Sequence, residues 1–182
     1  MSILLKDVQM QAKEINLSND ISEWILPKGK ELFPEHALFL QKKLNELKGL
    51  LELYLHLHES TVPEMTEQLN RTWSTIVQDR NHHIVIKVVD NKIVSSCVCV
   101  IIPNLTRNVR PYAIIENVVT HKDYRGKGYA SECLAYAKGI AKKGNCYKMM
   151  LLTGSKKEST MEFYKSAGYN CSDKTAFVQW IE

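Results

Sequence analysis

The sequence of 182 residues lacks any apolar run that approaches the roughly 20 residues needed to cross a bilayer. Its first ten residues, MSILLKDVQM, reach charged side chains too early to form the apolar region of a secretory signal peptide. The five cysteines include no Cys-x-x-Cys pair, which argues against structural zinc. These absences lead us to expect a cytoplasmic protein with no membrane partner and no metal.

An excess of charge is also missing. The chain carries 24 Lys and Arg against 20 Asp and Glu, a net charge of +4, which suits an anionic ligand but is too small to indicate nucleic-acid binding. With 45% hydrophobic and 24% charged residues, the composition is that of a globular domain and excludes disorder and collagen. The sequence contains neither internal repeats nor low-complexity segments.

The chain divides into an N-terminal extension, residues 1–36, and a domain, residues 37–182. Leu4, Val8, Ala12 and Ile15 recur at helical spacing, which predicts a helical extension that packs on the domain or on a partner. A partly disordered leader is the alternative.

Within the domain, β-branched runs predict strands and apolar residues at helical spacing predict helices. The predicted strands are 37–40, 83–89, 92–102, 112–120, 147–152 and 175–181. The predicted helices are 44–57, 130–143 and 158–166. A further helix is predicted to begin near Thr61, where Glu64 would complete a capping box. Asp90-Asn91 forms the turn of a hairpin. The order predicts an α/β (α+β) fold with a mixed, mostly antiparallel central sheet flanked by helices.

One segment combines a strand, a glycine loop and a helix start. Arg125-Gly126-Lys127-Gly128 follows the strand 112–120 and precedes the helix. Glycines let the backbone approach a ligand, and the N–H groups of a helix N-terminus favour a phosphate or pyrophosphate. The spacing differs from that of a P-loop and from the dinucleotide Gly-x-Gly-x-x-Gly pattern. A plain strand-to-helix turn is the alternative.

Two motifs resemble those of the GNAT superfamily of N-acetyltransferases. Residues 125–130, RGKGYA, fit the R/Q-x-x-G-x-G/A signature, and residues 163–169, FYKSAGY, are similar to the family's second element. Lys157 and Thr160 depart from the Asn and Ala that many members carry there.

The resemblance implies acetyl-coenzyme A as the acetyl donor. The strand would offer backbone groups to the pantetheine arm, as an added strand would, and the Val118 N–H would polarise the thioester carbonyl. The implied binding residues are Val118, Val119 and Thr120 on the strand and Arg125, Gly126, Lys127, Gly128, Tyr129, Ala130 and Ser131 around the diphosphate.

Acetyl transfer to a primary amine needs a base, because an amine with a pKa near 10.4 is mostly protonated at neutral pH. Glu116 is the candidate, since it stands in an apolar strand two residues before Val118, and desolvation would make its carboxylate a better proton acceptor. Tyr164, in the second motif, is the candidate that protonates the departing thiolate. No histidine is assigned a role, and His121 is expected to face solvent.

The favoured function is an N-acetyltransferase that transfers acetyl from acetyl-coenzyme A to a small-molecule primary amine by direct attack in a ternary complex. A homodimer is left open. Residues 145–148 and the 115–117 strand segment look similar to glucosamine phosphate N-acetyltransferases, with Arg107 and Arg110 as candidate contacts to a sugar phosphate, but Asn117 replaces their Asp. Acetylation of protein amines is a third reading. A non-catalytic acyl-coenzyme A sensor is the fourth, against which Glu116 and Tyr164 argue.

Overall fold

The computed structural model describes residues 3–7, 45–57 and 59–181. Their core is a five-stranded sheet in the order β1-β2-β3-β4-β5. The strands are β1 (Ile3–Asp7), β2 (His82–Val89), β3 (Lys92–Ile102), β4 (Tyr112–Thr120) and β5 (Met149–Leu151). Neighbours from β1 to β4 pair antiparallel, and β5 pairs parallel with β4. The predicted mixed, mostly antiparallel sheet is therefore confirmed.

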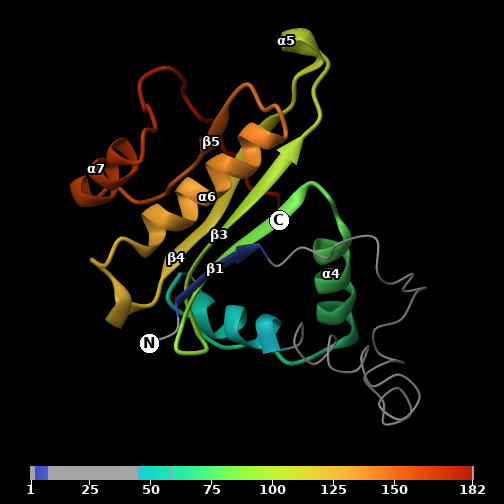
Figure 1. The fold of residues 1–182 in the computed structure, drawn as a ribbon, viewed down its shortest axis with the longest axis vertical. Helices are drawn as coiled ribbons and strands as arrows, with labels where there is room; N and C mark the ends of the chain where they lie inside the picture. The colour runs from blue at the N-terminus through green and yellow to red at the C-terminus, as the bar shows by residue number, and fades with distance from the viewer. Residues whose placement is uncertain (1–2, 8–44, 58, 182) are drawn as a thin grey trace.

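Helices lie on both faces of this sheet. Residues 45–54 are helical, and the further helices are α4 (Glu67–Gln78), α5 (Thr106–Val109), the 3₁₀ turn η1 (Lys122–Tyr124), α6 (Tyr129–Lys143) and α7 (Glu158–Ser166). Figure 1 shows α6 lying across the sheet and α5 at the tip of a loop that projects from one end of it. No helix in the described part of the chain is long and apolar enough to span a membrane.

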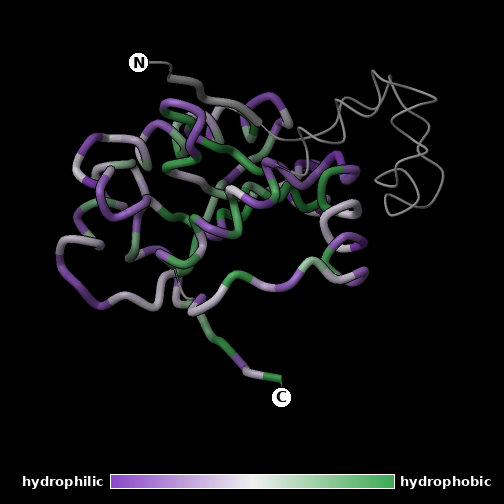
Figure 2. Tube along the Cα trace, turned by 90° about the horizontal axis from the view of Figure 1, so that it is seen from below, coloured by the Kyte–Doolittle hydropathy of each residue, from purple (hydrophilic) through white to green (hydrophobic). Residues whose placement is uncertain are grey.

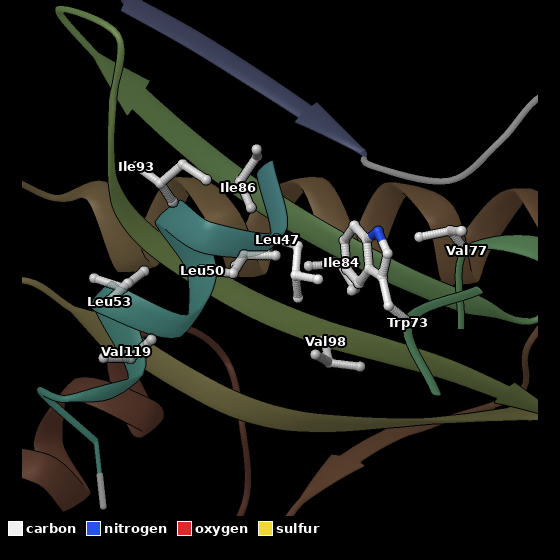
Figure 3. Close-up of a cluster of buried hydrophobic side chains, with 10 residues drawn as sticks. All are labelled: Leu47, Leu50, Leu53, Trp73, Val77, Ile84, Ile86, Ile93, Val98 and Val119. Carbon is white, nitrogen blue, oxygen red and sulfur yellow. The ribbon is translucent and has the colours of Figure 1, made fainter. Parts of the chain in front are cut away.

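Side chains along the central strands point alternately to the two faces of the sheet, and each face has its own hydrophobic core. Ile84 and Ile86 of β2 point into one core, while Val85 between them points into the other. In the first core, Figure 3 shows side chains of the 45–54 helix and of α4, including Leu50 and Trp73, packed against the strands. The second core lies under α6 and α7. Because both faces are covered, β2 and β3 are apolar and buried along most of their length.

Two local irregularities shape the strands. Asp90 and Asn91 both have left-handed φ angles, 46° and 63°, which confirms the predicted tight hairpin between β2 and β3. Between β3 and β4, Ser96 pairs with Val119 but Val98 pairs with Glu116, so β4 carries a bulge. Asn117 in that bulge has φ 50°, a left-handed value that asparagine tolerates better than most residues.

Several predicted boundaries agree with the structure, but β5 is shorter than the predicted 147–152, the helix predicted at 44–57 ends at residue 54, and α4 starts later than predicted. β3, β4 and α7 have the predicted limits, and α6 ends before Gly144 as expected. The helix predicted from Thr61 begins instead at Glu67, with the Thr66 hydroxyl accepting the Leu69 N–H at 3.2 Å. The predicted start was wrong because Thr66, and not Thr61, is the residue whose side chain caps the helix.

The two ends of the chain also differ from the predictions. Residues 3–7, predicted to begin a helix, form β1, whose partner is β2. The rest of the extension and the strand predicted at 37–40 lie outside the described residues. Residues 175–181, predicted to close the sheet, form no strand and are exposed. A strand requires a partner, and sequence pattern alone does not supply one.

Candidate active site

The site begins where β4 loses its second neighbour. β5 pairs with β4 only at Ala113, Ile114 and Ile115, so in the described sheet the rest of β4 has β3 on one side and an open edge on the other. An open strand edge presents unpaired N–H and C=O groups that an extended ligand can bind.

The direction of these backbone groups follows from one hydrogen bond. The His121 N–H donates to the Val94 carbonyl at 2.9 Å, so His121 faces β3. Successive residues of a strand turn their backbone groups to alternate edges, and Val119 therefore also faces β3. The N–H and C=O groups of Val118 and Thr120 face the open edge. Of the three strand residues implied for the pantetheine arm, Val118 and Thr120 thus turn their backbone groups to the open edge, whereas Val119, between them, turns its own toward β3.

The glycine loop lies at the end of this open edge. Gly126 and Gly128 have φ angles of 73° and 80°, and a Cβ added to either would meet no atom of the described residues within 4 Å. Gly128 immediately precedes α6, so the N–H groups of Tyr129, Ala130 and Ser131 have no partner within the helix. The loop therefore combines free backbone donors with open space, as a phosphate site requires.

Two basic residues of the loop are held in place. The Arg125 Nε donates to the Thr120 carbonyl at 3.2 Å, which puts the guanidinium group at the open edge of β4. The Lys127 Nζ lies 4.9 Å from the ring centroid of Tyr124. Their positive charges flank the α6 N-terminus and add to the partial positive charge of the helix end.

An ion pair that the sequence analysis missed fastens the start of α6 to the sheet. Lys87 of β2 pairs with Glu132 in the first turn of α6, and its Nζ lies 5.3 Å from the ring centroid of Tyr129. The Lys87 side chain is only 7% exposed. Lys87 is the single lysine in the apolar run of β2, and this isolated charge is the feature of the sequence that could have indicated an ion pair. The pair fixes the orientation of the α6 N-terminus.

The two predicted catalytic residues approach the opening from different elements. Glu116 is exposed, so the desolvation expected from its apolar strand is not found. Tyr164 of α7 is half-buried and packs against the second core. Burial raises the pKa of Tyr164, and the negative charges that Cys97 and Glu116 can carry raise it further. The phenol therefore stays protonated at neutral pH and lies within electrostatic reach of Glu116.

A second tyrosine packs behind Tyr164. The rings of Tyr164 and Tyr169 meet edge to face with centroids 6.1 Å apart, and the Tyr169 N–H donates to the Tyr164 carbonyl at 3.0 Å. Burial strongly raises the pKa of Tyr169. Its buried hydroxyl finds no hydrogen-bond partner among the described residues. Tyr169 thus supports the position of Tyr164 by packing.

The bulge of β4 has its own support from the opposite layer. Tyr54, in the 45–54 helix, is largely buried, which raises its pKa, and a hydrogen bond with the side chain of Asn117 opposes that rise. Asn117 is the left-handed residue between Glu116 and Val118. Tyr54 therefore contacts the residue that sets the direction of the strand between the candidate base and the candidate oxyanion donor.

Other candidates fall elsewhere. Arg110 precedes β4, at the end opposite the glycine loop, and donates to the Asn145 and Cys146 carbonyls at 3.2 Å each. Arg107 lies 5.9 Å from the ring centroid of Tyr147 in the same region. His121 was expected to face solvent, but its side chain is mostly covered, with the His56 ring centroid 4.2 Å away. Among the described residues, no His, Cys, Asp and Glu cluster could hold a metal.

A mixed sheet that opens beside a glycine loop and a helix N-terminus offers a site for an elongated ligand that carries a phosphate at one end. The model of the acetyltransferase (GNAT) family matches residues 47–169. The chain belongs to this family, and the fold and enzyme class that the two motifs implied are confirmed.

Individual relatives agree with this assignment. A solved structure from Agrobacterium tumefaciens strain C58, assigned as an acetyltransferase, is 38% identical with a TM-score of 0.68, over 74% of this chain and 94% of that one. Glucosamine 6-phosphate N-acetyltransferase of Trypanosoma brucei brucei is 29% identical over 136 residues, which is 71% of this chain and 86% of the relative. The Arabidopsis thaliana enzyme of the same name shares the fold, with 22% identity, a TM-score of 0.66 and 77% and 94% coverage.

Proposed function

We propose that the protein transfers the acetyl group of acetyl-coenzyme A to the primary amine of a small molecule. The observation that carries this proposal is the open edge of β4 leading into the glycine loop and the α6 N-terminus. An elongated ligand would fit this site if its extended amide arm lay along the β4 edge and its diphosphate lay against the glycine loop and the α6 N-terminus. The GNAT family uses such a donor.

Backbone groups would do most of the binding. The outward-facing N–H and C=O groups of Val118 and the N–H of Thr120 are suited to the pantetheine amides, as in the addition of a strand, whereas the Thr120 carbonyl already accepts from Arg125. The diphosphate would lie against residues 125–131, where the free N–H groups, Arg125 and Lys127 supply positive potential. The Val118 N–H, aimed at the open edge, would stabilise the negative charge that develops on the thioester oxygen.

Proton transfer would fall to two side chains. We assign proton removal from the amine to Glu116, which stands two residues before Val118, and its exposed carboxylate could take the proton directly or through a water molecule. The amine nitrogen then attacks the thioester carbon, and the carbon–sulfur bond breaks. Tyr164, with its raised pKa, keeps the proton that it would donate to the departing thiolate.

An amino-sugar phosphate is the second candidate acceptor. It is favoured by the Trypanosoma brucei brucei relative, whose name states that activity. The position of Arg110 weighs against the predicted phosphate contact, because its guanidinium group bonds to backbone carbonyls at the far end of β4. Asn117 in place of an acidic residue weighs in the same direction.

Release of free thiol from acetyl-coenzyme A, measured with a panel of amines, tests the proposal. The panel should contain glucosamine 6-phosphate, glucosamine, a polyamine, amino acids and a lysine peptide. We expect turnover with at least one small amine and none without an amine. Thermal protection by acetyl-coenzyme A with no turnover on any amine would instead favour a sensor. Turnover on the peptide alone would overturn the small-molecule proposal.

A further inference from the structure

A positive charge is buried beneath the start of α6. In Figure 2, hydrophobic stretches of the chain run through the middle of the folded body, and hydrophilic stretches lie mostly around it. Lys87 is an exception, because among the described residues it is the only lysine or arginine that is buried. Burying a charged group is costly unless the charge is paired. A lysine at this position therefore carries a free-energy cost that an apolar residue would avoid.

The Lys87 side chain reaches the first turn of α6 from the sheet. Val85 of β2 points into the core under α6, and Lys87, two residues further along the strand, points to the same face. The Lys87 Nζ pairs with the Glu132 carboxylate and lies 5.3 Å from the ring centroid of Tyr129. Both contacts are with residues of the same helical turn, so the ammonium group lies directly under the α6 N-terminus.

The carboxylate of Glu132 has two opposite effects in this turn. A negative charge near a helix N-terminus stabilises the helix, because it interacts favourably with the partial positive charge of the helix end. The same charge repels an anionic ligand bound to the free N–H groups of that turn, which is where we place the diphosphate. The Glu132 side chain is 45% exposed, so water screens its charge only in part. A cation paired with this carboxylate would cancel the repulsion and leave the helix intact.

We infer that Lys87 is a positioning residue that holds and neutralises Glu132, and thereby allows the first turn of α6 to bind the diphosphate of acetyl-coenzyme A. Lys87 acts through Glu132, whose carboxylate it pairs with from the buried side. The inference rests on the proposed function, since it requires that the diphosphate binds at the α6 N-terminus. It assigns a role in donor binding to a residue of β2, a strand that contributes nothing else to the proposed site.

Calorimetric titration of acetyl-coenzyme A into three variants of the full chain tests the inference. Lys87→Met leaves an unpaired carboxylate beside the diphosphate and should weaken binding about tenfold. Glu132→Gln should bind at least as tightly as the natural chain, and the double variant Lys87→Met/Glu132→Gln should return to within about threefold of it. A double variant that binds no better than Lys87→Met would mean that Lys87 only supports the fold, and the inference would fail.

Thermal melts of the unliganded variants should give a different order. Glu132→Gln leaves the buried Lys87 ammonium group without its partner, so it should have the lowest melting temperature of the three. Lys87→Met leaves Glu132 in contact with water and should melt higher, although it binds the donor most weakly. If affinity instead falls in the same order as melting temperature, loss of structure explains the binding data and the inference is overturned.

A matched control and a change of salt separate the local charge from the net charge. Lys142→Met removes one positive charge from the last turn of α6 and should bind acetyl-coenzyme A as the natural chain does. An equal loss of affinity in Lys142→Met and Lys87→Met would overturn the inference. Raising the ionic strength should reduce the difference between Lys87→Met and the natural chain, because salt screens the half-exposed carboxylate.

The outcome for the natural chain distinguishes this inference from the proposed function. A natural chain that does not bind acetyl-coenzyme A would overturn the proposed function, and the inference with it. A natural chain that binds, together with a Lys87→Met variant that binds equally well, would overturn the inference alone.

Discussion

Adding a single methyl group at Gly128 should separate the binding role of the loop from its folding role. Gly128 has φ 80° and ψ 0°. A Cβ there would meet no atom of the described residues within 4 Å, so Gly128→Ala introduces no clash in the protein alone. The cost to folding is the left-handed conformation, about 1–2 kcal/mol. For a domain of this length this corresponds to a melting temperature about 2–8 °C lower.

The effect on binding should be separate and additional. Because the methyl group would occupy space beside the free N–H groups of α6, where we place the diphosphate, acetyl-coenzyme A should bind at least about tenfold more weakly, or about 1.4 kcal/mol. Calorimetric titration measures the dissociation constant, and a thermal melt of the unliganded protein measures the folding cost.

Gly168 supplies a matched control. Its φ is 89°, and a Cβ there also meets no described atom within 4 Å, but it lies after α7 and outside the loop. Gly168→Ala should lower the melting temperature by a similar amount and leave the affinity for acetyl-coenzyme A unchanged. Equal affinities for the Gly128 and Gly168 variants would refute the placement of the diphosphate.

Three further predictions concern side chains of the site and its core. Tyr164→Phe should slow turnover at least about tenfold, with the affinity for acetyl-coenzyme A nearly unchanged. The control is Tyr169→Phe, which deletes a buried hydroxyl without a described partner and should keep activity and change stability by no more than about 1 kcal/mol. Similar turnover rates for the two variants would show that Tyr164 is not the proton donor. Glu116→Gln should slow turnover by roughly 10²–10⁴ and abolish the acidic limb of the rate profile, and a rate within a few-fold of the natural enzyme would send the base elsewhere. Burial raises the pKa of Cys133 to about 11, so a thiol reagent at pH 8 should label exposed Cys171 promptly and Cys133 only after unfolding, as peptide mapping can establish.

The sequence predicted the elements whose signals are local. The limits of β4 follow from the apolar residues on either side of Glu116 and Asn117, and those of α6 from glycines on either side of it. The glycine loop was likewise identified from residues adjacent in sequence. Elements defined by distant partners were not. The helical spacing of Leu4 and Val8 obscured β1, which exists through pairing with β2 some eighty positions along the chain.

The same distinction applies to the site. The bulge at Asn117 depends on how β4 aligns with β3, and its contact with Tyr54 depends on the packing of a helix onto the sheet. The pairing of Lys87 with Glu132 joins residues 45 positions apart. Such arrangements leave at most a weak trace in a single sequence, for example a lone lysine in an apolar strand. The exposure of Glu116 was misjudged for the same reason, because what covers a strand side chain depends on how distant elements pack over that face of the sheet.

Residue-resolved amide hydrogen exchange tests the central claim, that the open edge of β4 receives the acetyl donor. The N–H groups of Val118 and Thr120 face that edge, whereas the N–H of Val119 faces β3 and serves as the internal control. On addition of saturating acetyl-coenzyme A, exchange at Val118 and Thr120 should slow at least about tenfold more than at Val119. If these two amides exchange at the same rate with and without the ligand, while the ligand demonstrably binds, the donor lies elsewhere and the account is contradicted.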